Sequence, residues 1–204
     1  MATLPKAVIQ KRIRQHTLPP LPLPLGLRER LRPAAVLVPL LEKKGEWHLL
    51  LTRRTQHVGN HKGQVAFPGG AMEPKDPSPE ATALRETFEE IGIPPETIDV
   101  IGRLPEQPVI SGFLVTPVVA FLPTHVRWRP SREEIARVFT VPLAWLGNPD
   151  HLSLSTVHTW EGVKYPVHYY QPYEGEVIWG LTARIIQSLI KALTPPGPPL
   201  SSII

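Results

Sequence analysis

Three glutamates at helical spacing are the residues of this chain best suited to chemistry. Glu86, Glu89 and Glu90 stand at i, i+3 and i+4, and residues at these spacings are neighbours on a helix surface. Crowding them costs an isolated helix roughly 0.2–0.5 kcal/mol per pair, so local stability does not explain the cluster. Mg²⁺ prefers oxygen ligands and usually keeps some water and substrate phosphates. The spacing therefore predicts a divalent-cation site, with a solvated helix face as the alternative.

Two further groups suit a phosphate-bearing ligand. Gly69 and Gly70 end a strand-like segment, where glycine lets the backbone approach a ligand and offer a carbonyl to a metal. The polar loop before them carries several basic side chains, and arginine binds phosphate oxygens as a fork whereas lysine acts as a point charge. The basic residues of this loop are Arg53, Arg54, His57, His61 and Lys62. For the two histidines, a place in a basic loop without a ligand is the better reading.

A helix over residues 78–91 must position the glutamates. Ser78 is a good N-cap, Pro79 suits the first turn and Gly92 is a good C-terminal stop. Arg85 adjoins Glu86 and is expected to hold a glutamate in its metal-facing rotamer. The helical wheel predicts a core face opposite the glutamates, made of Ala81, Leu84, Phe88 and Ile91.

The remaining pattern predicts a mixed sheet with helices on both faces, an α/β (α+β) fold. A regular βαβ alternation, which would favour a doubly wound parallel sheet, is absent from the sequence. The expected strands are 34–41, 47–52, 100–104 and 113–122, with a hairpin of 157–160 and 165–171 turning at Gly162. A short helix is expected at 133–138 and a closing amphipathic helix at 179–193.

Composition excludes several kinds of site. The 204 residues include no cysteine, which excludes disulfides, thiolate metal sites and a cysteine nucleophile. No apolar run reaches the roughly 18 residues that a bilayer span needs, and a cytoplasmic location is expected. Two of the proline clusters among the 26 prolines lie near the ends, at 19–24 and 195–199. We therefore expect a domain over 34–193 between an irregular, basic, Pro-rich extension over 1–33 and a Pro-rich tail over 194–204.

The residues around the glutamates resemble the Nudix box. Gly69-Gly70 followed by Arg85-Glu86-Thr87-Phe88-Glu89-Glu90-Ile91-Gly92-Ile93 is similar to that family's pattern of glycine, a distant acid, and Arg-Glu-apolar-any-Glu-Glu-any-Gly-apolar. Thr87 stands where an apolar residue is usual. The distant glutamate would fall at Pro77, and Asp76 or Glu73 is expected to replace it.

A second set of motifs resembles the coenzyme A diphosphatase branch of the Nudix family. Leu50-Leu51-Thr52-Arg53-Arg54, Gly63 and Phe67-Pro68-Gly69-Gly70 keep that branch's spacing, although Gly59 stands where arginine is usual. The segments 111–117 and 178–183 are also similar to the branch, so the resemblance spans roughly residues 34–193. It implies a Nudix-type α/β/α sandwich that cleaves coenzyme A or a derivative to 3′,5′-ADP and phosphopantetheine.

The resemblance also implies roles for individual residues. Mg²⁺ or Mn²⁺ would be held by Glu86, Glu89, Glu90 and a carbonyl at Gly70 or its neighbour. Catalytic work is expected from Glu89, Glu86 and Arg85, with Glu134 as a candidate base because the family often places an acid in a late loop. An equally good interpretation of Glu134 is an exposed charge on a helix with no catalytic role. The expected substrate-binding residues are Arg54, Lys62, Arg53 and Phe67.

Other functions stay open. ADP-ribose, a dinucleotide polyphosphate or another nucleoside diphosphate conjugate is the main alternative substrate. A Nudix domain that only binds a ligand is less favoured, because all three box glutamates are present. The formal charge of +4 is compatible with a nucleic-acid partner, but no basic-aromatic motif supports one. We expect neither a nucleic-acid nor a membrane partner. A monomer and a homodimer both stay open.

Overall fold

The computed structural model describes residues 4–16, 23, 25–56, 62–160 and 163–195. In this part of the chain, a mixed sheet has the order β3-β2-β1-β7-β5, with β4 beside β1, β6 beside β7 and β8 beside β2. Only the β1–β7 pair is parallel among these described strands. The strands are β1 Arg32–Lys43, β2 Glu46–Arg54, β3 Val65–Ala66, β4 Gly69–Ala71, β5 Asp99–Arg103, β6 Gln107–Val109, β7 Phe113–Phe121 and β8 Ile135–Pro142.

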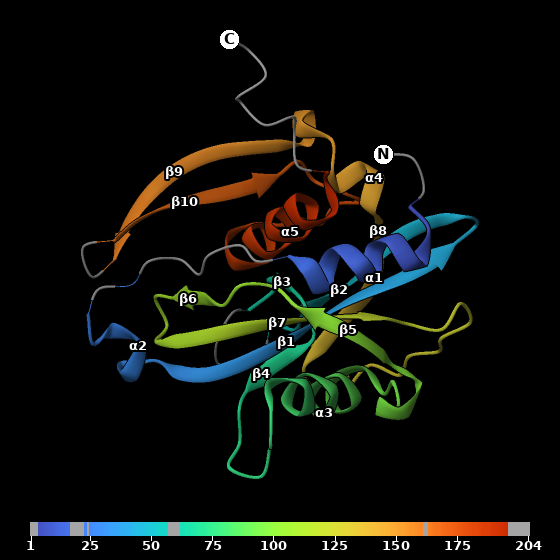
Figure 1. Ribbon diagram of the computed structural model, residues 1–204, viewed down its shortest axis with the longest axis horizontal. Helices are drawn as coiled ribbons and strands as arrows, with labels where there is room; N and C mark the ends of the chain where they lie inside the picture. Colours follow the sequence, from blue (N-terminus) through green and yellow to red (C-terminus); the bar gives the residue numbers. More distant parts are fainter. Residues whose placement is uncertain (1–3, 17–22, 24, 57–61, 161–162, 196–204) are drawn as a thin grey trace.

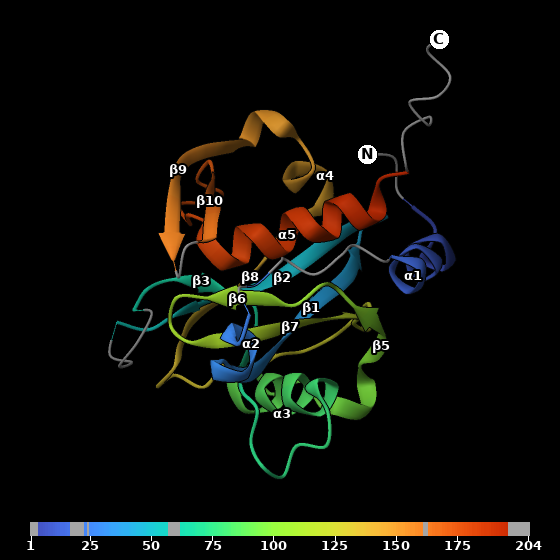
Figure 2. The ribbon, with the colours of Figure 1, turned by 60° about the vertical axis from the view of Figure 1, so that its left-hand side comes forward.

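Helices cover both faces of this sheet, which confirms the predicted architecture. Helix α3 (Pro79–Ile91) lies on one face, and α1 (Lys6–Gln15) and α5 (Gly180–Leu193) lie on the other (Figures 1 and 2). A separate hairpin of β9 (Leu152–Trp160) and β10 (Val163–Tyr170) stands beside α5. The short helices are α2 Leu27–Arg30, α4 Leu143–Leu146, η1 Pro95–Thr97 and η2 Pro149–His151.

Strand β1 links the two halves of the core. Its successive side chains point to opposite faces of the sheet, so Val38 and Leu40 pack with the α1 and α5 side while Leu37 and Leu41 pack with the α3 side. All four are buried. This near-continuous apolar pattern is what a strand covered on both faces requires.

The limits of α3 agree with the predicted capping residues. The Ser78 side chain accepts a hydrogen bond from the backbone N–H of Ala81 at 3.2 Å, and Pro79 is the first helical residue. At the other end Gly92 adopts a left-handed conformation with φ 68°, which residues with a Cβ adopt at a cost of roughly 1–2 kcal/mol.

The predicted core face of α3 is confirmed for Ile91 and for Leu84, which packs against the core, but it is wrong for Phe88. Phe88 is 52% exposed, whereas Glu90 is only 4% exposed. The helix presents Ala83, Thr87 and Ile91 to the protein interior, and the Thr87 hydroxyl bonds the carbonyl of Ala83 at 2.6 Å. Because these residues are four apart, they share one face, and that face carries Glu90 inward beside them.

Two other expectations about secondary structure are also wrong. The segment 133–138 was expected to be helical, but it forms a turn followed by β8, whose β-branched Ile135 and Val138 pair with β2. The N-terminal segment was expected to be irregular, but Lys6–Gln15 forms α1, whose Ile9 and Ile13 are buried in the core on the α5 side. Of the two proline clusters, the residues Pro19, Pro20, Pro22, Pro24, Pro196, Pro198 and Pro199 lie outside the described residues.

Among the described residues, every helix is too short or too polar to cross a lipid bilayer. The largest described helices, α3 and α5, instead pack on the sheet through one side.

The burial of α1 predicts a measurable contribution to stability. Ile13→Ala should lower the free energy of unfolding by about 2–5 kcal/mol, because it leaves a cavity between α1 and the sheet. Urea denaturation followed by circular dichroism would measure it. The neighbouring exposed variant Arg14→Ala should stay within about 0.5 kcal/mol of the parent. Equal stability of the two variants would mean that α1 does not pack on the core in solution.

Candidate active site: an acidic cluster in an extended cavity

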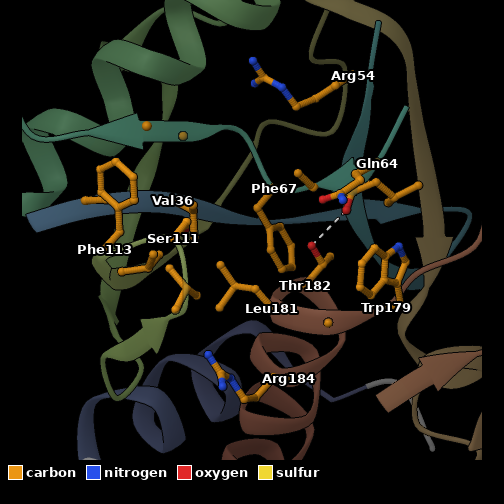
Figure 3. A pocket seen from close by; sticks show the side chains of 18 of the residues that line it. Val36, Arg54, Gln64, Phe67, Ser111, Phe113, Trp179, Leu181, Thr182 and Arg184 are labelled. Atoms are coloured by element: carbon orange, nitrogen blue, oxygen red, sulfur yellow. Dashed lines mark hydrogen bonds between the residues drawn. The ribbon is translucent and has the colours of Figure 1, made fainter. Parts of the chain in front are cut away.

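Two of the box glutamates, Glu86 and Glu90, line a cavity of about 750 Å³. It lies where the partners of β1 change, since β1 pairs with β4 at Ala34–Val36 and with β2 from Leu40 onward. Side chains of α3, β2, β4, β6, β10 and α5 line it, and Figure 3 shows Arg54 and Arg184 on opposite sides with Phe67 between them. The charged residues in its described lining are Arg54, Glu86, Glu90, Glu134 and Arg184.

Glu90 is the most buried of these acids. One carboxylate oxygen accepts a hydrogen bond from Arg54 Nη1 at 3.1 Å, and the other lies 3.4 Å from the backbone nitrogen of Gly69. Burial raises the pKa of Glu90 to about 8, and the opposing attraction of Arg54 does not cancel this effect. The negative charges of Glu86 and Glu134 add to the rise. The buried carboxylate therefore lies in a site that needs positive charge.

Glu86 lies directly against the glycine pair. A Cβ on Gly70 would come within 2.5 Å of the Glu86 carboxylate, so any larger residue would require this carboxylate to move. Burial raises the pKa of Glu86, while its contact with Arg85 lowers it. Gly70 is part of β4, hydrogen-bonded beside β1, rather than the start of a loop, so the backbone at this point is fixed by the sheet.

Arg85 connects the glutamates to the segment before the helix. Its Nη1 lies 2.9 Å from Glu86 and 3.0 Å from Glu89, and its Nη2 lies 2.9 Å from Asp76 and 3.2 Å from the Ala71 carbonyl. The hydrogen bonds from Arg85 hold the pKa of Asp76 well below its usual range. Asp76 therefore keeps its charge and fixes the guanidinium between itself and the two glutamates.

Of the two acids expected to replace the upstream glutamate, Asp76 has the closer contact with Arg85. The second candidate, Glu73, is 47% exposed and lies 3.7 Å from Arg85 Nη1. The buried Asp76 also accepts hydrogen bonds from the Thr82 hydroxyl and from the Glu73 backbone N–H. Asp76 thus braces the start of α3 as well as the arginine.

The donors at this site suit a hard divalent cation. They are carboxylate and carbonyl oxygens, which Mg²⁺ and Mn²⁺ prefer, and the raised pKa values of Glu86 and Glu90 mark a place where a cation would be stabilised. Within the described part of the chain, no three acidic or histidine side chains already surround one point as a metal cage. Arg85 and Arg54 contact the glutamates instead. A cation that bound the glutamates would therefore displace some of these arginine contacts.

Arg54 and Glu134 meet at the same end of the cavity. Arg54 Nη2 lies 3.8 Å from the Glu134 carboxylate, and Glu134 is 51% exposed in the turn before β8. Both side chains line the cavity. The expected late acid therefore lies near Glu90, with one arginine between them.

Arg53 and Lys62 lie elsewhere. Arg53 is beside Arg54 on β2, and because neighbouring strand residues point to opposite faces, its Nε lies 3.5 Å from Glu176 instead. Lys62 is exposed and is not among the residues that line the cavity. Phe67 is 4% exposed and contributes to both the cavity wall and the core. His57, Gly59 and His61 lie outside the described residues.

The far end of the cavity contains residues that the sequence did not assign. Trp179, Tyr169 and Thr182 line it, and the Thr182 hydroxyl bonds the carbonyl of Val65 at 2.9 Å (Figure 3). The segment 178–183 had been recognised only as similar to the coenzyme A branch. That similarity was the available signal for a role in binding, but it did not show which way the side chains point.

Comparisons with known proteins agree with this arrangement. The model of the NUDIX domain matches residues 31–161. A relative from Enterobacter sp. (strain 638), described as the uncharacterized Nudix hydrolase NudL, is 44% identical over 164 residues, covering 78% of this chain and 81% of its own. A protein of the same description from Salmonella paratyphi B (strain ATCC BAA-1250 / SPB7) is 43% identical over 162 residues, with the same coverage.

A solved structure supports the fold. The NUDIX hydrolase from Alicyclobacillus acidocaldarius superposes with a TM-score of 0.51 at 18% identity, covering 81% of this chain and 93% of that one. The acidic helix, the glycine strand beside it and the mixed sheet thus occur together with a family match over more than half of the sequence. The chain therefore belongs to the Nudix family of hydrolases, which act on nucleoside diphosphate derivatives.

Proposed function

We propose that this hydrolase cleaves the diphosphate of coenzyme A or of a coenzyme A derivative. The observation that carries the proposal is the position of the motifs that resemble the coenzyme A branch. The motif at 50–70 contributes Arg54, Phe67 and Gly69-Gly70 to the cavity. The segment 178–183 contributes the start of α5 to the same cavity. The cavity volume of about 750 Å³ is within the range of sites that take cofactor-sized ligands.

The proposed metal site consists of Glu86, Glu89, Glu90 and a backbone carbonyl at Gly70. Bound Mg²⁺ or Mn²⁺ would neutralise phosphate charge and make water more acidic. Glu90 and Glu86 approach from the buried side, and Glu89 lies on the exposed turn of the same helix. Arg85 is proposed as the positioning residue, because it contacts Glu86 and Glu89 and is itself held by Asp76.

The reaction is the attack of a water oxygen on one phosphorus of the diphosphate. The bond from that phosphorus to the bridging oxygen breaks, the bridging oxygen leaves with the second phosphate, and the water proton passes to a carboxylate. Glu89 and Glu134 are the proposed bases, since both are about half exposed, Glu134 lines the cavity and Glu89 shares Arg85 with Glu86. Arg54 lies beside Glu90 and is proposed to bind the phosphate oxygens during the reaction.

A substrate panel tests the proposed function directly. With Mg²⁺ or Mn²⁺, the full chain should convert coenzyme A to 3′,5′-ADP and 4′-phosphopantetheine, identified by product mass. ADP-ribose and a dinucleotide polyphosphate in the same panel should be turned over with lower kcat/KM. Higher kcat/KM on either of these would reject coenzyme A as the preferred substrate.

Removing a proposed metal ligand should abolish most turnover without unfolding the protein. Glu90→Gln and Glu86→Gln each lose a charged oxygen, so kcat should fall by more than the roughly 10–100-fold that loss of an outer partner of a ligand costs. Calorimetric titration with Mn²⁺ should show weaker binding. The exposed variant Glu96→Gln is the control and should match the parent protein. Near-normal activity of Glu90→Gln or Glu86→Gln would contradict the ligand assignment.

The two adjacent arginines of β2 give a matched pair. Arg54→Ala should raise KM for coenzyme A by roughly 10–150-fold, the equivalent of one charged hydrogen bond of about 1.5–3 kcal/mol. Arg53→Ala should change KM little, because Arg53 contacts Glu176 instead. Steady-state kinetics on both variants would measure this difference, and equal effects would remove the phosphate role from Arg54.

A further inference from the structure

An aromatic side chain lies uncovered at the far end of the cavity. Trp179 is 37% exposed, although large apolar side chains are usually buried. Among the described residues, the large hydrophobic side chains that are both exposed and part of the cavity lining are Trp179 and Ile110. Exposed apolar surface at a cavity is a common mark of a ligand-binding region.

The indole of Trp179 is held in one orientation by its neighbours. Its ring stacks on Tyr169 with centroids 5.5 Å apart and an angle of 8° between the planes. The two residues also form an isolated antiparallel bridge, and the adjacent Tyr170 N–H bonds the Ile178 carbonyl at 2.8 Å. Because Tyr169 covers one face of the indole, the part that lines the cavity is the opposite face and the ring edge.

The position of Trp179 separates it from the catalytic end. Figure 3 shows Trp179 beside Thr182 and Gln64, with Arg54 well away from it. A ligand with its diphosphate at Glu86 and Glu90 would therefore reach Trp179 with a group some distance along the molecule. A rigid, flat ring face favours a flat partner, and every nucleobase has such a face.

We propose that Trp179, supported by Tyr169, stacks on the nucleobase of the substrate. The nucleoside half then occupies the end of the cavity formed by β10 and the start of α5, and the other half of the diphosphate conjugate leaves the catalytic end in a different direction. This inference rests on the proposed function for its choice of substrate. The stacking itself requires only that the ligand carry a base, so it would hold for any nucleoside diphosphate conjugate.

Product inhibition separates the two halves of the substrate. In Trp179→Leu, the inhibition constant of 3′,5′-ADP should rise by about 10-fold, which corresponds to 1.4 kcal/mol and falls within the range for loss of one base stack. The inhibition constant of 4′-phosphopantetheine, which has no base, should not change. Trp179→Phe keeps a flat ring and should restore most of the binding. Val177→Ala, an exposed neighbour outside the cavity lining, is the control.

A second comparison does not depend on coenzyme A turnover. Calorimetric titration of the full chain with AMP and with ribose 5-phosphate compares one phosphate with and without a base. The parent protein should bind AMP more tightly, and Trp179→Leu should lose that difference while unfolding at the same urea concentration as the parent. If coenzyme A is not cleaved but this difference is found, the proposed substrate fails and the base site stands.

Three results would overturn the base site. An equal rise in both inhibition constants would place Trp179 in the support of the catalytic end instead. A rise for 4′-phosphopantetheine alone would assign this end of the cavity to the other half of the substrate. Equal affinity of the parent protein for AMP and ribose 5-phosphate would show that no base is recognised.

Discussion

Negative charge enclosed by protein is the constraint on which the rest of this structure depends. Glu90 is 4% exposed, and burial of an ionised carboxylate is costly unless positive charge or hydrogen bonds accompany it. Arg54 reaches it from β2, and the backbone N–H of Gly69 lies close to it on β4. Two strands and a helix must therefore keep a fixed relation at this point. The sheet provides that relation, because β2 and β4 both pair with β1.

The arginines in this site act as counter-ions to the glutamates. Arg85 and Arg54 hold all three box glutamates in the structure, and Asp76 keeps Arg85 from leaving. A cation that binds the glutamates relieves their mutual repulsion and releases part of this arginine contact. Under the proposed function, Arg54 would then be available to the phosphates, while Asp76 keeps Arg85 in place.

The sequence was informative where spacing alone determines geometry. The i, i+3, i+4 glutamates, the Ser78 cap and the Gly92 stop all lie where the helix pattern predicts them. It was less informative where tertiary packing decides between two faces. The helical wheel put Phe88 inside and Glu90 outside, because an apolar residue is normally the better one to bury. Here Ala83 is small and the Thr87 hydroxyl is satisfied by the Ala83 carbonyl, so this side of α3 can lie close to the sheet. Glu90 is buried beside these two residues.

Other differences have similar physical causes. Residues 133–138 have enough charge to resemble a helix, yet the strand partner offered by β2 decides their conformation. Arg53 and Arg54 are both arginines on β2, and they have different partners because neighbouring strand residues point to opposite faces of the sheet. The orientation of Trp179 could not be predicted from the sequence, since it depends on where β10 places Tyr169.

The first and last described helices also meet. Arg12 on α1 donates a hydrogen bond to the carbonyl of Leu193 at the end of α5, across 181 residues of chain. Contacts between such distant segments form late, because the intervening chain must be ordered first. Because a chain is made from its N-terminal side, the apolar side of α1 stays uncovered by α5 until α5 has been synthesised, and Ile9 and Ile13 are exposed apolar side chains during that interval.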